Sequence, residues 1–179
     1  RSTGVRVLNY SGSGIETTFT QGEDACLAAL VPELPKQASG AARSLLVVGT
    51  LPDVVEDQFQ RLFAELGIPT AFFPPRRAGE LPAVGPQTVY LLAQPFLGAA
   101  AQALDERGAQ RLAAPFPLGV EGTRGWLAAA ARAFAIPDQR LNEVVAPAEK
   151  RARAALEPAR ERLAGKRIFF FPDSQLEVP

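Results

Sequence analysis

The most constraining feature of the sequence is a continuous apolar run at residues 45–48 (LLVV), followed closely by the pattern of an amphipathic helix. An unbroken apolar run of this length is typical of a strand covered on both faces, as strands of parallel sheets are. The helix pattern begins near Pro52 and Asp53 and stops at Gly67. Its apolar positions recur at three- and four-residue steps: Val55, Phe59, Leu62, Phe63 and Leu66. Together the run and the helix predict a strand-to-helix unit.

The same alternation continues along the chain. The pattern predicts further strands at residues 68–73, 88–93 and 110–113, and helices at residues 96–107 and 122–135. Alternating units with short connections favour right-handed crossovers and a mostly parallel sheet. The predicted fold class is therefore α/β, with a Rossmann-like, mostly parallel sheet flanked by helices. Such sheets bind ligands at the carboxyl ends of their strands.

The chain divides into four predicted segments. Residues 1–43 hold a strand at 5–9, a loop and a short helix at 22–30, and residues 44–139 form a Rossmann-like middle domain. Residues 140–166 form a connecting helix, which Pro158 should kink or divide. Residues 167–179 supply the first strand of a following domain, with the apolar run 168–171. Because the chain opens without Met and stops just after this run, we expect an internal piece of a longer polypeptide.

Composition narrows the possible chemistry. The chain has no His and one Cys, so it lacks the commonest general base and cannot complete an iron–sulfur site by itself. Lys plus Arg and Asp plus Glu both total 19, and this balance gives no reason to expect a nucleic-acid or anionic-lipid partner. No apolar stretch of membrane-spanning length and no signal peptide is present, so the cytoplasm is the expected location.

Several motifs have two possible interpretations. Residues 12–17 (GSGIET) match two glycines of a dinucleotide-binding fingerprint but lack the third, which favours a plain flexible loop. Cys26 lies on the apolar face of a short predicted helix and is interpreted as a packed thiol rather than a ligand. Arg76 and Arg77 are either a solvated pair or an anion site. The loop 115–122 (PFPLGVEG) either carries function after a strand or simply fixes a turn.

The segment around residues 19–24 also has two interpretations. Glu23 and Asp24 suit the start of the helix that begins at Gly22, where carboxylates complement the helix dipole. The alternative is that the residues just before them line a cavity. These residues are Phe19, Thr20, Gln21 and Gly22.

Four blocks carry a resemblance to a known family: residues 18–24 (TFTQGED), 51–59 (LPDVVEDQF), 91–97 (LLAQPFL) and 115–122 (PFPLGVEG). In this order they resemble the N subunits of light-independent protochlorophyllide reductases, a nitrogenase-like family. The shorter blocks 163–167 (LAGKR) and 174–177 (SQLE) fit as well. The resemblance implies the middle one of three Rossmann-like domains, with the entry to the third.

The resemblance also implies a reaction and its partners. Enzymes of this family reduce the C17–C18 bond in ring D of protochlorophyllide to give chlorophyllide. The N and B subunits form a heterotetramer with a [4Fe–4S] cluster, and a separate ATP-hydrolysing iron–sulfur L protein delivers the electrons. The cluster cysteines belong to an N-terminal part of the N subunit that this chain lacks, and the fourth ligand is an aspartate of the B subunit. Cys26 is therefore assigned no metal.

For the residues of this chain, the resemblance implies substrate binding only. By analogy with nitrogenase, Phe19, Thr20, Gln21 and Gly22 are expected to line the cavity that holds protochlorophyllide, and no residue is assigned a catalytic or metal-binding role. The 179 residues alone are expected to be inactive. Two alternatives remain: a subunit of the related chlorophyllide reductase, which acts on ring B, and a non-catalytic Rossmann-like module that carries or assembles a tetrapyrrole.

Overall fold

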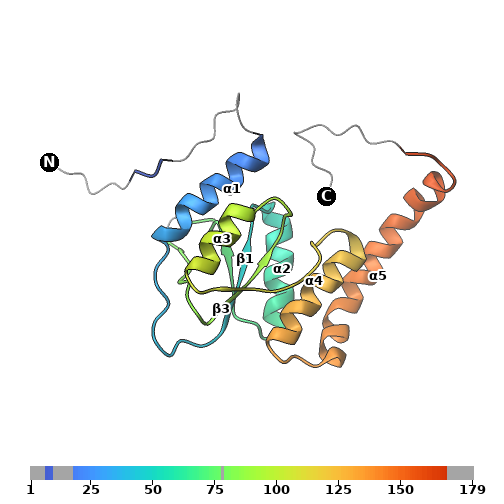
Figure 1. Ribbon diagram of the computed structural model, residues 1–179. Coiled ribbons are helices and arrows are strands. Elements are labelled where there is room, and N and C mark those ends of the chain that lie inside the picture. Colours follow the sequence, from blue (N-terminus) through green and yellow to red (C-terminus); the bar gives the residue numbers. More distant parts are fainter. Residues whose placement is uncertain (1–6, 10–17, 78, 169–179) are drawn as a thin grey trace.

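A computed structural model describes residues 7–9, 18–77 and 79–168 of the chain. Five α-helices, one short 3-10 helix and four strands occur in this part (Figure 1). In chain order they are α1 (Phe19–Leu30), η1 (Val31–Glu33), β1 (Ser44–Val48), α2 (Asp53–Glu65), β2 (Thr70–Phe73), β3 (Thr88–Leu92), α3 (Gly98–Glu106), β4 (Gln110–Arg111), α4 (Gly119–Ala133) and α5 (Asp138–Leu163).

The four strands form one parallel sheet in the order β2-β1-β3-β4. The central strands β1 and β3 pair in the register Leu46 to Tyr90, and all five residues of β3 are buried. The continuous apolar runs of these two strands are what burial on both faces requires. The predicted fold class, a Rossmann-like parallel sheet flanked by helices, is confirmed.

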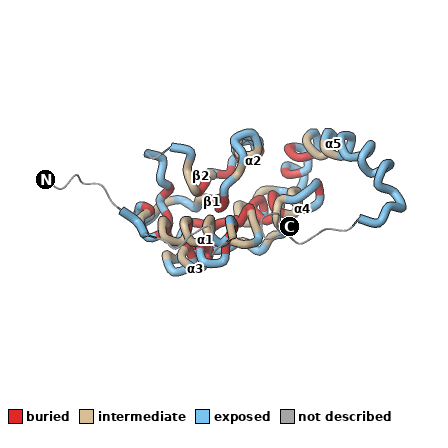
Figure 2. Tube along the Cα trace, turned by 90° about the horizontal axis from the view of Figure 1, so that it is seen from above, coloured by how far each residue is buried: buried red, intermediate tan, exposed pale blue. Residues whose placement is uncertain are grey.

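Helices cover both faces of the sheet (Figure 1). On one face α2, α4 and α5 pack around Trp126, whose ring lies 4.8 Å from that of Phe59 and 5.6 Å from that of Phe63. On the other face α1 and α3 pack around Tyr90 and Phe73. The red, buried positions of Figure 2 accordingly run through the middle of the layers, with exposed positions outside. Sheet and helices thus share two hydrophobic clusters, one on each face.

The structure corrects several predictions for single elements. Residues 7–9 form no strand, and residues 5 and 6 of that predicted strand lie outside the described residues. The first helix begins at Phe19 rather than at Gly22, so Phe19, Thr20, Gln21 and Gly22 lie in a helical turn and not in a loop. The glycine motif at 12–17 and most of the run 168–171 also lie outside the described residues, and the division into four segments stays a prediction.

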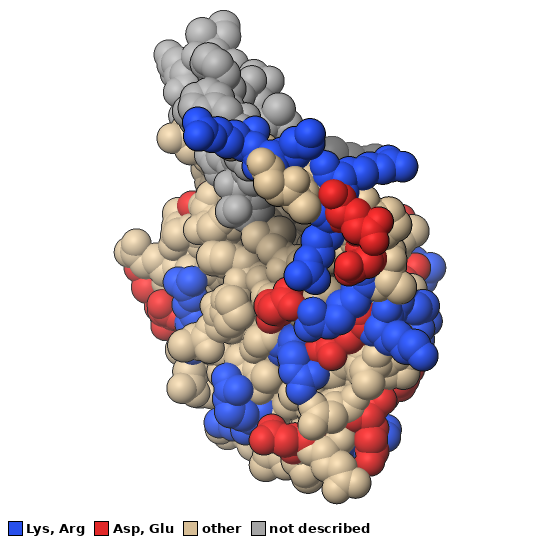
Figure 3. Space-filling view, turned by 90° about the vertical axis from the view of Figure 1, so that its right-hand side faces the viewer, with Lys and Arg blue, Asp and Glu red and all other residues tan. Residues whose placement is uncertain are grey.

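Helix α5 is one unbroken helix despite its two internal prolines, so the possible division at Pro158 is wrong. Its first half is anchored to the body. Arg124 of α4 pairs with Glu149 at 2.9 Å, and Arg140 donates to the carbonyl oxygen of Glu65 in α2 at 2.9 Å. Its second half is exposed, and positive and negative side chains are interspersed over this side of the molecule (Figure 3). No helix within the described residues is long and apolar enough to cross a membrane.

Candidate functional site at the carboxyl edge of the sheet

The sheet has a topological switch point between β1 and β3. From β1 the chain runs through α2 on one face to β2, and from β3 it runs through α3 on the opposite face to β4. The two connections therefore diverge just beyond Val48 and Leu92. In open α/β sheets, a crevice at such a point is the usual ligand site. The geometry of this edge therefore defines the candidate site.

Helix α1 begins with a capping box. The backbone N–H of Gln21 donates to the Thr18 hydroxyl at 3.2 Å, and the backbone N–H of Thr18 donates to Gln21 Oε1 at 2.9 Å. These two bonds satisfy backbone donors that a helix start leaves unpaired. A further hydrogen bond joins the hydroxyls of Thr18 and Thr20, whose oxygens lie 2.9 Å apart. The first turn of α1 is therefore well defined by local hydrogen bonds.

The two acids that follow this turn reach the sheet edge. Glu23 Oε1 accepts from the backbone N–H of Thr50, directly beyond β1, at 2.9 Å. The carboxylate of Asp24 accepts from the N–H groups of Ala99 and Ala100 at 2.8 Å each, and so caps α3. The predicted role of these acids, complementing the start of their own helix, is thus corrected: they fasten α1 to the two diverging connections. Phe19, Thr20, Gln21 and Gly22 consequently lie beside the switch point.

The four predicted site residues differ in exposure. The Phe19 side chain is 78% exposed, which is unusual for a large apolar residue, and Gln21 is exposed too. Thr20 is buried, and Gly22 has open space around the position of a Cβ atom. The turn therefore presents an aromatic ring and an amide to solvent, with Thr20 packed beneath.

Sequence analysis missed two residues at this edge, Thr50 and Gln94. Gln94 Nε2 donates to the carbonyl oxygen of Thr50 at 2.8 Å and so bridges the ends of β1 and β3. Gly49 makes this approach possible, because a Cβ atom there would lie 2.1 Å from Gln94 Oε1. The sequence does hold a signal for Thr50 and Gln94, because each is a polar residue one or two places beyond a buried strand.

The other singled-out motifs have structural roles. Arg76 lies 2.9 Å from Glu56, 2.8 Å from Asp57 and 3.5 Å from Asp53, so it ties the chain after β2 to the start of α2. Burial raises the pKa of Glu56 above its ordinary value, although the charge of Arg76 lowers it. Arg77 remains 82% exposed and pairs with Glu80 at 3.5 Å. With three carboxylates around it, Arg76 has little capacity left for an external anion.

Helix α4 begins at Gly119 rather than at Gly122, so only residues 115–118 of the predicted loop 115–122 are a loop, and they pack closely on the start of α4. A Cβ atom on Gly122 would lie 2.5 Å from the Phe116 carbonyl oxygen, and one on Gly125 would lie 2.7 Å from Pro115 Cγ. The glycines therefore allow the loop to lie against the helix, as the turn interpretation requires. Phe116 also packs against the cluster on the α1 and α3 face, whereas α4 belongs to the other face. The loop thus connects the two faces.

Cys26 is half-buried in α1. No group of three or more His, Cys, Asp or Glu side chains in the described residues could hold a metal ion. The described residues therefore do not fit an iron–sulfur cluster.

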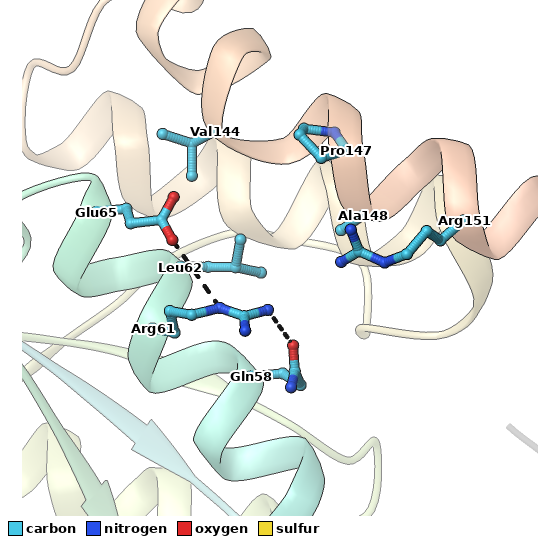
Figure 4. A pocket seen from close by; sticks show the side chains of 8 residues that line it. All are labelled: Gln58, Arg61, Leu62, Glu65, Val144, Pro147, Ala148 and Arg151. Atoms are coloured by element: carbon cyan, nitrogen blue, oxygen red, sulfur yellow. Dashed lines mark hydrogen bonds and ion pairs between the residues drawn. The ribbon is translucent and has the colours of Figure 1, made fainter.

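A separate pocket of about 690 Å³ lies between α2 and α5 (Figure 4). It is lined by the apolar Leu62, Val144 and Pro147 and by Arg61 with its partners Gln58 and Glu65. None of the predicted site residues lines it. It lies against the second half of α2, which runs from the carboxyl edge toward the start of β2. Since ligand sites of parallel sheets lie at the opposite edge, it is not the candidate site.

The parallel sheet with its switch point places the chain in the Rossmann-like class of α/β proteins. The chain belongs to the family of nitrogenase component 1 type oxidoreductases, whose family model matches residues 1–179. It is 69% identical over 175 residues to the light-independent protochlorophyllide reductase subunit N of Rhodospirillum rubrum. The match covers 97% of this chain and 40% of that protein.

Two further relatives carry the same name. The subunit N of a Bradyrhizobium species is 66% identical over 179 residues, and that of Rhodopseudomonas palustris is 65% identical over 179 residues. Each match covers 99% of this chain and 42% of the relative. The chain thus spans about two fifths of the length of the curated relatives it matches.

Proposed function

We propose that this chain is part of the catalytic component of a light-independent protochlorophyllide reductase, which reduces ring D of protochlorophyllide to give chlorophyllide. The observation that carries the proposal is the identity of 65–69% with subunits N of that enzyme over nearly the whole chain. The family match over all 179 residues supports it, because it indicates an oxidoreductase of the nitrogenase component 1 type.

In this proposal Phe19, Thr20, Gln21 and Gly22 line the cavity for the pigment. The support is their position: they form the first turn of α1, which Glu23 and Asp24 hold at the carboxyl edge of the sheet. Protochlorophyllide is flat and largely apolar, and an exposed aromatic ring is a suitable surface for it. Phe19 and Gln21 would contact the pigment, and the buried Thr20 would support the turn from below.

The proposed complex contains a B subunit and receives electrons from an ATP-hydrolysing iron–sulfur L protein. Its [4Fe–4S] cluster would take its ligands from outside the described residues, since these hold no suitable group of side chains. We therefore assign to this chain substrate binding and positioning, and no proton or electron transfer.

The test uses the full-length N subunit in complex with its B subunit, with protochlorophyllide, dithionite, ATP and the L protein. We expect chlorophyllide, seen by its absorbance. Replacing Phe19 with Ala should weaken pigment binding about tenfold, the order of magnitude for losing one buried aromatic contact. The matched control is Leu156→Ala, which truncates another exposed apolar residue (53% exposed) on α5.

Three results would contradict the proposal. An intact complex that turns over chlorophyllide at ring B, and not protochlorophyllide, would identify a chlorophyllide reductase-type subunit. A full-length protein that binds pigment without iron or sulfide would identify a carrier or scaffold. Equal pigment affinity of F19A and L156A would remove the substrate role of the α1 turn.

A further inference from the structure

The backbone N–H and the backbone carbonyl of Thr50 are both held by side chains from other elements. Its N–H donates to Glu23 Oε1 at 2.9 Å, and its carbonyl oxygen accepts from Gln94 Nε2 at 2.8 Å. Glu23 comes from α1, whereas Gln94 follows β3. The backbone of one residue therefore connects α1 with the ends of both central strands.

The side chains of Glu23 and Gln94 meet the chain at the switch point, directly beyond β1. Gln94 crosses from one strand end to the other, and a Cβ atom on Gly49 would lie 2.1 Å from Gln94 Oε1 and displace it. Glu23 reaches the same place from α1, through its bond to the Thr50 N–H.

We propose that Glu23 is a positioning residue for substrate binding: its bond to the Thr50 peptide fixes the first turn of α1 against the carboxyl edge. This inference rests on the proposed function, because it takes that turn as part of the pigment cavity. The local capping box defines the shape of the turn, and Glu23 defines where the turn stands relative to the sheet. Asp24 holds the same helix at a second point, the start of α3.

Loss of the Glu23 bond leaves α1 attached by Asp24 and by its buried face, but its first turn then occupies more than one position. The apparent affinity for a ligand falls in proportion to the fraction of molecules in the binding-competent position. Chemistry in the bound complex is unaffected, so the change should appear in KM and leave kcat nearly unchanged.

Three substitutions of Glu23 distinguish the effect of its side-chain length from the effect of its charge. Glu23→Gln keeps an oxygen at the same reach and removes the charge, so it can still accept from the Thr50 N–H. Glu23→Asp keeps the charge but is one methylene shorter, and Glu23→Ala removes the acceptor. The matched control is Glu80→Ala, which removes the exposed partner of Arg77, an ion pair in which neither α1 nor Thr50 takes part.

The experiment measures KM and kcat for protochlorophyllide in the full N and B complex, together with the absorption spectrum of the bound pigment. We expect E23A and E23D to raise KM about tenfold, as loss of a charged hydrogen bond to a peptide group predicts. Their kcat should stay within about twofold of the wild-type value, because the lost interaction stabilises the bound substrate and the transition state equally. The spectrum of the bound pigment should stay at its wild-type position in both, because the pigment still binds the same competent position, while E23Q and E80A keep the wild-type KM as well.

Two failures can be told apart. A wild-type complex that makes no chlorophyllide overturns the proposed function, whatever the variants do. A wild-type complex that is active while E23A and E23D have the KM of E80A overturns the positioning role alone. If E23A does not assemble, the comparison of E23D with E23Q decides: a raised KM in both, or in neither, contradicts the proposal.

Discussion

Gly49 shows how a single residue shapes the candidate site. Its φ angle is +125°, in a region that residues with a side chain rarely adopt, and Gln94 lies against its Cα. The backbone conformation and the packing therefore both favour glycine at this position. Without a side chain here, Gln94 can reach the Thr50 carbonyl and join the ends of β1 and β3.

We expect Gly49→Ala to lower the free energy of unfolding by about 3 kcal/mol, because it combines backbone strain with a clash. The added Cβ atom would lie 2.1 Å from Gln94 Oε1 and 3.0 Å from Leu97 Cδ1. Urea denaturation followed by circular dichroism measures the change. Gly98→Ala is the matched control, since nothing lies within 4 Å of its Cβ position, and it should change stability by no more than about 0.5 kcal/mol. Equal midpoints for the two variants would contradict this account.

The bonds that make the candidate site are also the part that residue-level patterns could not predict. Glu23 and Thr50 are 27 residues apart, and Asp24 and Ala99 are 75 apart. A carboxylate near a helix start is equally compatible with local capping, and only the fold decides between the partners. The Thr18 and Gln21 pair is different, because its spacing is a capping signal and indicates a helix beginning at Phe19. The acids at positions 23 and 24 favour a later start at Gly22, so the two local signals conflict.

At the scale of elements, strands β1 and β3 follow from the sequence because each is continuously apolar. Strand β4 is shorter than predicted: only Gln110 and Arg111 belong to it, and both are exposed at the edge of the sheet. A short exposed edge strand has no apolar pattern to fix its bounds. Helix α5 continues through Pro158, and the sequence alone could not tell whether the proline would divide it.

Strand β3 and helix α3 are joined through Tyr90. Its hydroxyl donates to Asp105 Oδ1 at 2.7 Å and to the Ala101 carbonyl oxygen at 3.1 Å, and the side chain is fully buried. Burial raises the pKa of the Tyr90 hydroxyl far above its ordinary value of 10.0, and the hydrogen bond to Asp105 raises it further. The phenol therefore stays neutral in the fold at a pH where it ionises in the unfolded chain.

This shift predicts alkaline destabilisation. The stabilisation of the fold by the neutral Tyr90 hydroxyl is complete below pH 10.0. It is lost as the pH rises toward the folded-state pKa, because the unfolded chain releases the Tyr90 proton first. The slope in that range is about 1.4 kcal/mol per pH unit for one group. At pH 8, Tyr90→Phe should lower the free energy of unfolding by about 1 kcal/mol, because a hydrogen bond is lost. Between pH 8 and pH 11, however, the free energy of unfolding should fall less in this variant than in the wild type. Urea denaturation at both pH values tests this, and equal losses would refute it.

At the scale of the whole molecule, the two hydrophobic clusters depend on the same strands. In β1 the side chains of Leu45 and Val47 belong to the cluster around Trp126, whereas those of Leu46 and Val48 belong to the cluster around Tyr90. Strand β3 alternates in the same way. Neither face can lose its packing without loosening strands that the other face needs, so the sheet and its helices should unfold together.

We therefore expect a mutation that creates a cavity on one face of the sheet to lower the unfolding midpoint measured on the other face. Leu46→Ala, in the cluster on the α1 and α3 face, should lower the free energy of unfolding by about 3 kcal/mol. Trp126, the only tryptophan of the chain, lies in the opposite cluster, and its fluorescence midpoint in urea should fall by the same amount as the circular dichroism midpoint. The control Leu156→Ala removes an exposed side chain and should leave both midpoints in place. A circular dichroism midpoint that falls in L46A without the fluorescence midpoint would show that the two faces unfold separately.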